Sequence, residues 1–429
     1  MKQAIGGKKK IAAIKGTKDI LPPETRKWQW VENQARELFE RYGYRELRAP
    51  VFEATELFER GTGTSSDIVL KEMYTFTDKG GRSLTLRPEY TPSVVRAIIE
   101  HRLYLQPRPL RFYYIGPMFR YDKPQKGRYR QFHQIDIEVF GEKDAGIDAE
   151  IIQMAQALLT KVGVTDYRIL INSVGCPRCR PPYVEKLRQA AEQVREALCP
   201  DCQRRIELNP LRLFDCKVET CRELAQEFPR ITDYLCSECT EHFQQVQAYL
   251  DVFGLEYQLE PRLVRGLDYY TKTTFEFVTS ALGAQDAILG GGRYDEMMKL
   301  FGGPDLCGIG FAVGLERLLS LVTYQPSEAP FIFVAYLGEP AKQAAMKLVA
   351  TLREVGMECW LEYKERSLRN QLSRANKLGA TWTLIIGEDE VKSGRFNLKN
   401  MASGEQQEYT SAELLAYFRD YLHSKKSPS

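Results

Sequence analysis

The chain has 429 residues, which is more than one ordinary domain of ~100–200 residues needs, so two or three domains are expected. Hydrophobic residues make up 43%, charged residues 27% and aromatic residues 11%, a globular composition that excludes collagen-like and disordered proteins. The net charge of +3 excludes a polybasic, histone-like protein. No run approaches ~20 uninterrupted apolar residues, so a membrane span is excluded too.

The N-terminus is rich in lysine but does not have the pattern of a secretory signal. It lacks an apolar core and a small-residue cleavage site, and its six lysines are Lys2, Lys8, Lys9, Lys10, Lys15 and Lys18. We therefore expect a cytoplasmic protein. Because cytoplasmic thiols stay reduced, a clustering of the ten cysteines favours metal binding over disulfides.

The first half of the chain is predicted to contain a helix and several strands. A helix is expected from Pro22 to Gly43, with residues 28, 31, 35, 38 and 42 on one face. A short strand at 84–88 precedes a helix that starts at Pro92. Strands at 111–119 and 131–140 then flank a basic loop, residues 120–130, whose charges suit phosphate.

The strand at 131–140 has one apolar and one polar face. Residues 135, 137 and 139 are apolar and alternate with Gln134, Asp136 and Glu138. This pattern fits either a half-exposed edge strand or a strand whose polar face forms the floor of a pocket. His133 alternates away from the polar face, and we interpret it as a packed structural histidine.

Eight of the ten cysteines lie between residues 173 and 260, a segment with the character of an inserted module. Three pairs have Cys-x-x-Cys spacing and a fourth is looser; the pairs are Cys176/Cys179, Cys199/Cys202, Cys236/Cys239 and Cys216/Cys221. Two such pairs can supply the four thiolates of a structural zinc site. Pairing of the first with the second and of the third with the fourth is one arrangement, and buried thiols without metal are the alternative.

After this segment, β-type sequence returns at 262–278, followed by a triple-glycine turn at 290–292 and a glycine-rich strand at 308–313. The chain lacks a P-loop, and the glycines at 308–314 do not have dinucleotide-fingerprint spacing. Beyond Pro330, strands and helices alternate, which predicts a small separate α/β domain. Arginines stand at the ends of elements, an arrangement suited to gripping phosphate and carboxylate: Arg87, Arg120, Arg128, Arg265 and Arg317.

Several of these segments resemble a known family. Residues 116–120 (Gly-Pro-Met-Phe-Arg) and 124–134 (Pro-Gln-Lys-Gly-Arg-Tyr-Arg-Gln-Phe-His-Gln) resemble motif 2 of class II aminoacyl-tRNA synthetases in its histidyl version. The helix at Trp28 with the strand ending near Pro50 is similar to motif 1, and 310–318 to motif 3. Residues 263–271 (Leu-Val-Arg-Gly-Leu-Asp-Tyr-Tyr-Thr) and 291–295 (Gly-Gly-Arg-Tyr-Asp) resemble the two histidine-specific signatures of bacterial-type histidyl-tRNA synthetases.

The resemblance implies an α+β fold in three parts. The first is a class II catalytic domain, an antiparallel sheet flanked by helices, split into residues 1–172 (motifs 1 and 2) and 261–325 (histidine signatures and motif 3). A mainly helical Cys-rich insertion occupies 173–260, and a C-terminal α/β anticodon-binding domain 330–429. The implied activity is histidine–tRNA ligation by a homodimer that uses ATP with Mg²⁺, L-histidine and histidine tRNA.

The resemblance also implies roles for individual residues. The implied contacts of the histidine ammonium group are Glu89, Thr91 and Gln134. Those of the imidazole are Glu138 and Tyr270. Tyr269 and Tyr294 are implied to line the pocket. If the segment is extended, only one of Tyr269 and Tyr270 faces the pocket. Arg120 and Arg265 are the implied catalytic residues at the α-phosphate, and Arg128 and Arg317 join Arg120 in binding ATP. Lys123 and Gln125 are the implied contacts to the tRNA acceptor end.

Two departures and two rival interpretations accompany the resemblance. Tyr90 stands where many relatives have glycine, and Lys123 where some bacterial enzymes have an arginine that contacts the extra 5′ guanosine. One rival is a histidine-sensing regulatory subunit of the first histidine-biosynthetic enzyme, a group that typically lacks the Arg-Gly-Leu-Asp-Tyr-Tyr signature and the anticodon domain. The other is a synthetase-like tRNA sensor fused to a regulatory protein, and this chain has no kinase-like segment.

Overall fold

The computed structural model describes residues 11–63, 66–125, 127–283, 286–325 and 330–426. Four N-terminal lysines (Lys2, Lys8, Lys9 and Lys10) and Lys126 of the basic loop lie outside the described residues. The chain divides into two compact units, Met1–Pro326 and Ser327–Ser429.

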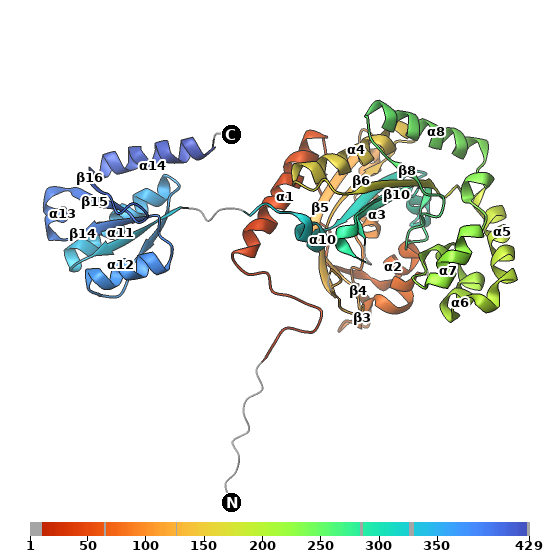
Figure 1. The fold of residues 1–429 in the computed structure, drawn as a ribbon, viewed down its shortest axis with the longest axis horizontal. Helices are drawn as coiled ribbons and strands as arrows, with labels where there is room; N and C mark the ends of the chain where they lie inside the picture. The colour runs from red at the N-terminus through yellow and green to blue at the C-terminus, as the bar shows by residue number, and fades with distance from the viewer. Residues whose placement is uncertain (1–10, 64–65, 126, 284–285, 326–329, 427–429) are drawn as a thin grey trace, which may run out of the picture. The chain divides into compact units, whose positions relative to one another are not determined.

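A large sheet forms the centre of the first unit (Figure 1). Its strand order is β1-β5-β6-β11-β10-β9-β7-β8. The two outer pairs, β1/β5 and β7/β8, are parallel and the other neighbours are antiparallel. The strands are β1 Arg45–Glu46, β5 Leu110–Phe119, β6 Gln131–Phe140, β7 Arg168–Ser173, β8 Gln258–Leu259, β9 Thr271–Val278, β10 Ala287–Arg293 and β11 Gly308–Gly314.

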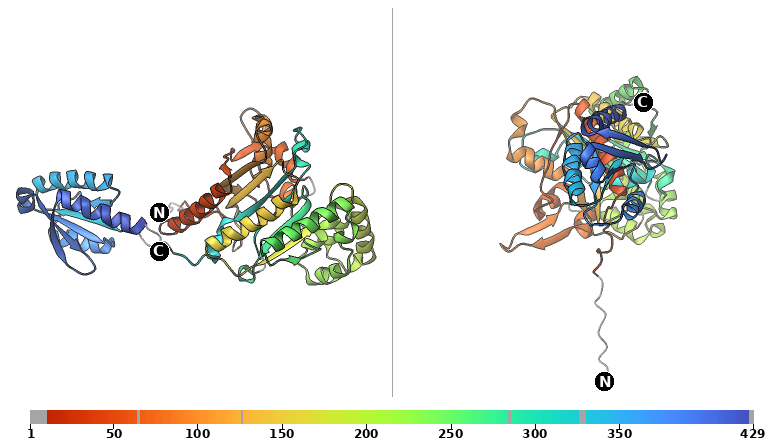
Figure 2. Two further views of the ribbon diagram at one scale, coloured as in Figure 1. Left: turned by 90° about the horizontal axis from the view of Figure 1, so that it is seen from above. Right: turned by 90° about the vertical axis from the view of Figure 1, so that its left-hand side faces the viewer.

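Helices cover one face of this sheet. The helices α1 (Glu24–Arg41) and α4 (Ala145–Lys161) lie side by side across it (Figure 2), and α10 (Leu315–Leu321) joins the same apolar core. The apolar side chains of β6 belong to this core, and Ile135 and Ile137 have no exposed area. The predicted apolar face of the strand is therefore confirmed, and it packs under α1 and α4 because alternate residues of a strand share one face.

The opposite face of the sheet is covered by smaller elements. Tyr114 and Met118 of β5 pack there against Val94 and Ile98 of a helix that follows the small sheet. These elements are α2 Thr55–Thr62, α3 Thr91–Glu100, α9 Met297–Leu300 and a sheet of order β2-β4-β3 with bounds Phe52–Ala54, Ser83–Leu86 and Tyr74–Thr77. The smaller elements leave part of the polar face of β6 uncovered, and the pocket described below opens there.

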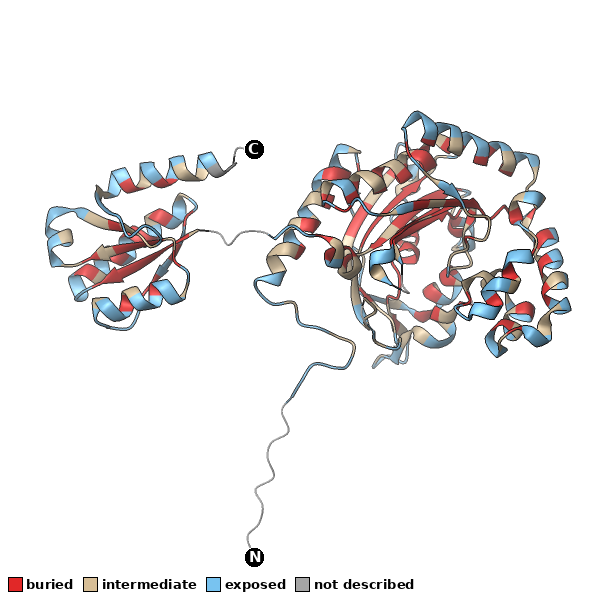
Figure 3. Cartoon of the chain, viewed as in Figure 1, coloured by how far each residue is buried: buried red, intermediate tan, exposed pale blue. Residues whose placement is uncertain are grey.

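The segment between β7 and β8 is mainly helical. Its helices are α5 Arg180–Gln193, α6 Pro200–Leu208, α7 Glu219–Leu224 and α8 Ser237–Val252. The first three enclose a small core of their own, in which Leu187, Cys202 and Ile206 have no exposed area. Figure 3 shows buried residues alternating with exposed ones along these helices. Helix α8 returns to the main core through Val246 and Leu250, so the segment is anchored where it ends.

The second unit is a five-stranded sheet of order β13-β12-β14-β15-β16 with helices around it. The strands β13, β12 and β14 run parallel, whereas β15 and β16 are antiparallel to their neighbours. The elements are β12 Phe331–Tyr336, α11 Glu339–Glu354, β13 Glu358–Leu361, α12 Leu368–Lys377, β14 Trp382–Ile386, α13 Glu388–Ser393, β15 Arg395–Asn400, β16 Gln406–Thr410 and α14 Ser411–Lys426. In neither unit is any described helix long and apolar enough to cross a bilayer.

Candidate active site

A pocket opens on the polar face of β6, beside β10 and β11. Each residue that the sequence predicts to contact histidine or ATP lines this pocket: Glu89, Thr91, Gln134, Glu138, Tyr269, Tyr270, Tyr294, Arg120, Arg128, Arg265 and Arg317. The pocket brings together residues that lie more than 200 positions apart in the sequence. Their contacts with substrates remain predictions, which the geometry of the pocket can support.

Strand register and glycines shape the pocket floor. Glu138 pairs with Gly310 and Gln134 with Gly314 on the neighbouring strand β11. A Cβ atom at Gly310 would collide with the Glu138 carboxylate. The glycine therefore leaves the space in which the Glu138 side chain lies flat against the sheet.

Two polar atoms on this floor are buried without a partner. Among the residues that the structure describes, no donor reaches the buried Oε1 of Gln134 or the buried Oδ1 of Asp136. An unsatisfied buried acceptor costs about 1–3 kcal/mol. A ligand with several N–H donors is therefore complementary to this floor.

Glu138 is a buried acidic group of the floor. It accepts hydrogen bonds from Thr91 Oγ1 at 2.5 Å and from the Tyr294 hydroxyl. Burial raises the pKa of Glu138 well above its usual range, the Thr91 hydrogen bond opposes that shift, and the neighbouring Asp136 and Glu89 add to it. Such a group favours a positively charged or hydrogen-donating ligand.

Glu89 provides a second buried carboxyl group. It accepts hydrogen bonds from Thr62 Oγ1 at 2.5 Å and from the Tyr269 hydroxyl at 2.9 Å, and burial raises its pKa. Both Tyr269 and Tyr270 line the pocket, with ring centroids 4.8 Å apart. The prediction that only one of them faces the pocket is wrong, because Tyr269 lies in a turn before β9 and not in an extended strand.

Guanidinium groups line the other part of the pocket, among them those of Arg120, Arg128, Arg265 and Arg317. Burial lowers the pKa of Arg317, and the nearby charges of Arg120, Arg128 and Arg265 lower it further. Mutual repulsion of this kind costs free energy in the absence of a counter-charge. The cluster is therefore suited to a polyanion such as the triphosphate of a nucleotide.

Each of these arginines is also held in place by the protein. Arg120 donates through Nε to the Pro88 carbonyl at 2.9 Å, and Arg317 donates to the Gly127 carbonyl at 3.2 Å. Arg265 forms an ion pair with Glu276. A Cβ atom at Gly290 would overlap the Arg265 guanidinium, so this glycine makes room for it on the sheet surface.

Arg87 and its neighbour Tyr90 have structural roles. Arg87 is buried outside the pocket lining and donates to the Pro117 and Ala49 carbonyls at 2.9 and 3.0 Å. It therefore ties loops together and does not face the pocket. Tyr90 stacks on Tyr114 with ring centroids 3.4 Å apart, and its hydroxyl donates to the Leu47 carbonyl. Tyr90 lines the pocket together with Glu89, Thr91 and Tyr114, so the departure from glycine leaves Glu89 and Thr91 in place.

His133 and the two predicted tRNA contacts lie outside the pocket lining. The backbone N–H of His133 donates to Glu316 at 3.0 Å, its Nδ1 lies 3.0 Å from the same carboxylate, and its ring meets Trp28 edge-on. These contacts support the structural interpretation of His133. Lys123 and Gln125 are exposed on the loop between β5 and β6, where a macromolecular partner can reach them.

Several residues that line the pocket were missed by the sequence reasoning. Asp136 and its hydrogen-bond partner Tyr114 line the floor, and Arg212 reaches the pocket from the inserted segment. The alternation along β6 already placed Asp136 on the polar face, so that signal was available. Nothing in the sequence around Arg212 indicates that it approaches a site formed by another part of the chain.

The cysteine pairs that are outermost in the sequence form one cluster, and the two pairs between them form another. Two groups of four have their sulfur atoms within 4.8 Å of one another: Cys176, Cys179, Cys236 and Cys239 form the first cluster, and Cys199, Cys202, Cys216 and Cys221 the second. The predicted combination of neighbouring pairs is therefore wrong. The first and last pairs meet because β7 and α8 bring the two ends of the inserted segment together, which encloses the other two pairs between them.

Comparisons with known proteins agree with this architecture. A family model described as histidyl-tRNA synthetase matches residues 16–318, and one described as an anticodon binding domain matches 332–421. The histidine–tRNA ligase of Halothermothrix orenii is 49% identical over 94% of this chain and 98% of the relative, and that of Solibacter usitatus is 50% identical over 95% and 98%.

Solved structures show the same relationship. The chain matches apo S. aureus histidyl-tRNA synthetase with a TM-score of 0.81 and 38% identity, covering 96% of this chain and 100% of the other. A structure named ATP phosphoribosyltransferase regulatory subunit/histidyl-tRNA synthetase, from Bacillus halodurans C, shares the fold at a TM-score of 0.60 and 21% identity, over 84% and 95% of the two chains. Since the catalytic motifs, the pocket and the family model coincide over most of the sequence, this chain belongs to the histidyl-tRNA synthetase family.

Proposed function

We propose that the pocket activates L-histidine with ATP to form histidyl-adenylate and pyrophosphate, and that the histidyl group then passes to a hydroxyl at the 3′ end of histidine tRNA with release of AMP. The observation that carries the proposal is the division of one pocket into two parts. The floor holds two buried acceptor atoms without donors among the described residues, and arginines line the other part. An amino acid with a donating side chain fits the first part and a triphosphate fits the second.

Different floor residues contact different parts of the histidine. Glu89, Thr91 and Gln134 take the ammonium group; the Thr91 hydroxyl donates to Glu138, and its oxygen still accepts a hydrogen. Glu138 and Tyr270 contact the two imidazole nitrogens. A substrate without both nitrogens leaves buried polar groups unpaired, which discriminates strongly against other amino acids.

The arginines stabilise the transfer of the adenylyl group. An oxygen of the histidine carboxylate attacks the α-phosphorus as the bond to the pyrophosphate oxygen breaks, so two anions approach each other. Arg120 and Arg265 lie on the α-phosphate and the attacking carboxylate, and Arg128 and Arg317 on the outer phosphates. Fixed guanidinium groups that bind the developing charge most strongly lower the barrier, and no side-chain nucleophile is needed.

Magnesium fits as a companion of the nucleotide. The carboxylates nearest to Arg128 are Asp122 and Glu72, and both are paired with that arginine. Mg²⁺ usually keeps several waters and takes one or two carboxylates together with phosphates. Glu72 and Asp122 would therefore hold it only at the outer phosphates, where it neutralises charge on the pyrophosphate leaving group.

The remaining assignments concern the tRNA and the assembly. Lys123 and Gln125 contact the acceptor end, the domain at 330–429 binds the anticodon, and the insertion at 173–260 lies along the acceptor arm. The catalytic domain comprises 1–172 and 261–325, and its motif 1 forms the interface of a cytoplasmic homodimer. These assignments rest on the family and on the exposure of both loop side chains.

Histidine-dependent exchange of labelled pyrophosphate into ATP tests the proposal. Wild type should exchange, and Arg265→Ala should lower the rate on the order of 10²–10³-fold, since it removes a fixed charge from the transition state. Arg262→Ala is the matched control, because Arg262 donates to the Ala225 carbonyl and does not line the pocket. Histidine binding without any exchange by wild type would instead favour the regulatory-subunit function.

A further inference from the structure

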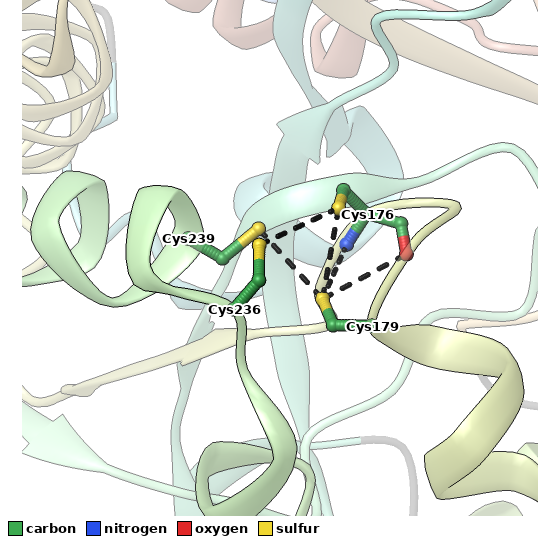
Figure 4. A group of neighbouring side chains, drawn as sticks. All are labelled: Cys176, Cys179, Cys236 and Cys239. Atoms are coloured by element: carbon green, nitrogen blue, oxygen red, sulfur yellow. Dashed lines mark hydrogen bonds between the residues drawn. The ribbon is translucent and has the colours of Figure 1, made fainter.

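The first cysteine cluster has the geometry of a single-ion site. The Sγ atoms of Cys176 and Cys179 are 3.7 Å apart, and those of Cys176–Cys236 and Cys179–Cys239 are each 3.8 Å apart. Figure 4 shows the four side chains pointing toward one another, two from the turn after β7 and two from the start of α8. Apolar packing alone does not require four cysteine sulfur atoms to converge on one point, whereas metal coordination does.

These distances match a tetrahedron of thiolates. With a Zn–S bond of about 2.3 Å, the edge of a regular S₄ tetrahedron is about 3.8 Å. A disulfide would require a sulfur separation of about 2.05 Å, and all eight cysteines of the clusters are free. A multi-iron cluster would spread the thiolates around a larger core than the 4.8 Å within which these sulfur atoms lie.

The second cluster repeats the arrangement inside the insertion. Its Cys199 and Cys216 sulfurs are 3.8 Å apart, and all four sulfurs lie within 4.8 Å. In both clusters a backbone N–H donates to sulfur: Cys199 N to Cys221 Sγ at 3.2 Å and, in the first, Cys176 N to Cys179 Sγ at 3.1 Å. Amide donors directed at sulfur favour the thiolate form that binds metal.

We propose that the insertion binds two zinc ions, one in each cluster, and that the ion in the first cluster fixes the base of the insertion against the histidine pocket. Four protein thiolates close each coordination shell, as in structural zinc sites. Each ion also adds stability that the insertion's own core does not supply, because α5, α6 and α7 enclose only a small apolar cluster.

The link to the pocket passes through Arg180 and Lys272. Arg180, which follows Cys179, donates to the Val174 carbonyl at 3.0 Å and to the Tyr270 carbonyl. Lys272 donates through its backbone N–H to the Gly175 carbonyl at 2.8 Å, and its ammonium group binds Glu238, which lies between the other two ligands, at 2.9 Å. The segment that carries Tyr270 is therefore hydrogen-bonded both to the turn of Cys176 and Cys179 and to Glu238 between Cys236 and Cys239.

Metal analysis of the full chain, purified with reductant and without chelator, tests the two ions. We expect two equivalents of zinc per chain, and about one equivalent in Cys239→Ser and in Cys202→Ser. Cys359→Ser, which removes a buried cysteine outside both clusters, should keep two. Zinc-free wild type with eight reactive thiols, or iron in place of zinc, would overturn the proposal, and wild-type analysis does not depend on any variant folding.

Arg180→Met tests the link without removing a thiolate. It should keep two zinc ions and raise the KM for histidine on the order of tenfold, with the KM for ATP little changed, because misplaced binding groups lose affinity steeply. This step rests on the proposed function. An unchanged KM for histidine with zinc retained would refute the link alone, whereas wild type that lacks pyrophosphate exchange would refute the function and leave the zinc result standing.

Discussion

Buried ionisable groups occur on both faces of the catalytic sheet, and their hydrogen-bonding capacity is met on one face and left partly unmet on the other. Under α4, Arg293 at the end of β10 donates to both Asp148 oxygens at 2.8–2.9 Å and to the Glu142 and Asp144 carbonyls at 3.0 Å. On the pocket face, the buried Asp136 carboxyl group keeps one oxygen without a donor among the described residues.

The difference separates stability from binding. A buried ion pair whose hydrogen bonds are complete holds its surroundings in place, and breaking it leaves an uncompensated charge. Buried acceptors that lack hydrogen-bond donors destabilise the protein. A ligand that donates these hydrogen bonds removes the destabilisation when it binds. One sheet can therefore be rigid under its helices and receptive on its other face.

Asp148→Asn is expected to have the largest effect on stability. It leaves the Arg293 guanidinium buried without its counter-ion, and such losses cost about 3–5 kcal/mol. Equilibrium urea unfolding of the full chain measures the cost. Asp305→Asn removes an exposed carboxylate paired with Lys299 at 3.1 Å and should cost less than ~1 kcal/mol. Equal shifts in the two variants would contradict the comparison.

Gly290→Ala should damage the pocket face with little effect on folding. The added methyl group displaces the end of the flexible Arg265 side chain, so histidine-dependent pyrophosphate exchange should fall on the order of a hundredfold. The melting temperature should stay close to that of wild type, because no backbone atom is displaced. Gly314→Ala is the matched control, since its methyl group meets only Arg317 carbons at 3.6 Å or more and should have a much smaller effect.

Exchange at the wild-type rate in Gly290→Ala would show that the position of Arg265 is not critical. A large fall in the melting temperature would instead show that this glycine serves the fold, and the separation between the two faces would not hold at β10.

Much of the pocket face could be predicted because its signals are local. The limits of β6, residues 131–140, and its two faces follow from strict alternation. The motif residues bracket strand ends, so the resemblance placed Glu89, Arg120 and Arg265 in one site. The alternation of strands and helices beyond Pro330 likewise predicted the α/β class of the C-terminal domain, although the short helix α13 was not predicted.

The covered face and the insertion gave weaker signals. Helix α4 was not predicted, because it is buried on most sides and its apolar residues do not form a single stripe. Arg293 belonged to a signature, but its partner Asp148 lies 145 positions earlier. The nesting of the cysteine pairs depends on the path of the chain through α5–α8, which local spacing does not determine.

Glu138→Gln is expected to show a small gain in stability that depends on pH. The pKa of Glu138 is raised in the folded protein by burial. A raised carboxyl pKa gives stability that is fully present below the unfolded value of about 4.3 and is lost as pH rises through the folded pKa. The amide does not ionise, so the variant should escape this loss and melt above wild type by roughly 2–4 °C near neutral pH.

Thermal melting at pH 5 and pH 8 tests this sign, because the advantage of the variant should grow with pH. Glu56→Gln, at an exposed position, should track wild type at both values. In the same preparation, histidine-dependent exchange should fall, since the amide presents an N–H where the imidazole needs an acceptor. A variant that melts below wild type at pH 8 would mean that the hydrogen bonds from Thr91 and Tyr294 are enough to stabilise the Glu138 carboxylate. Glu138 would then not destabilise the protein in the absence of histidine.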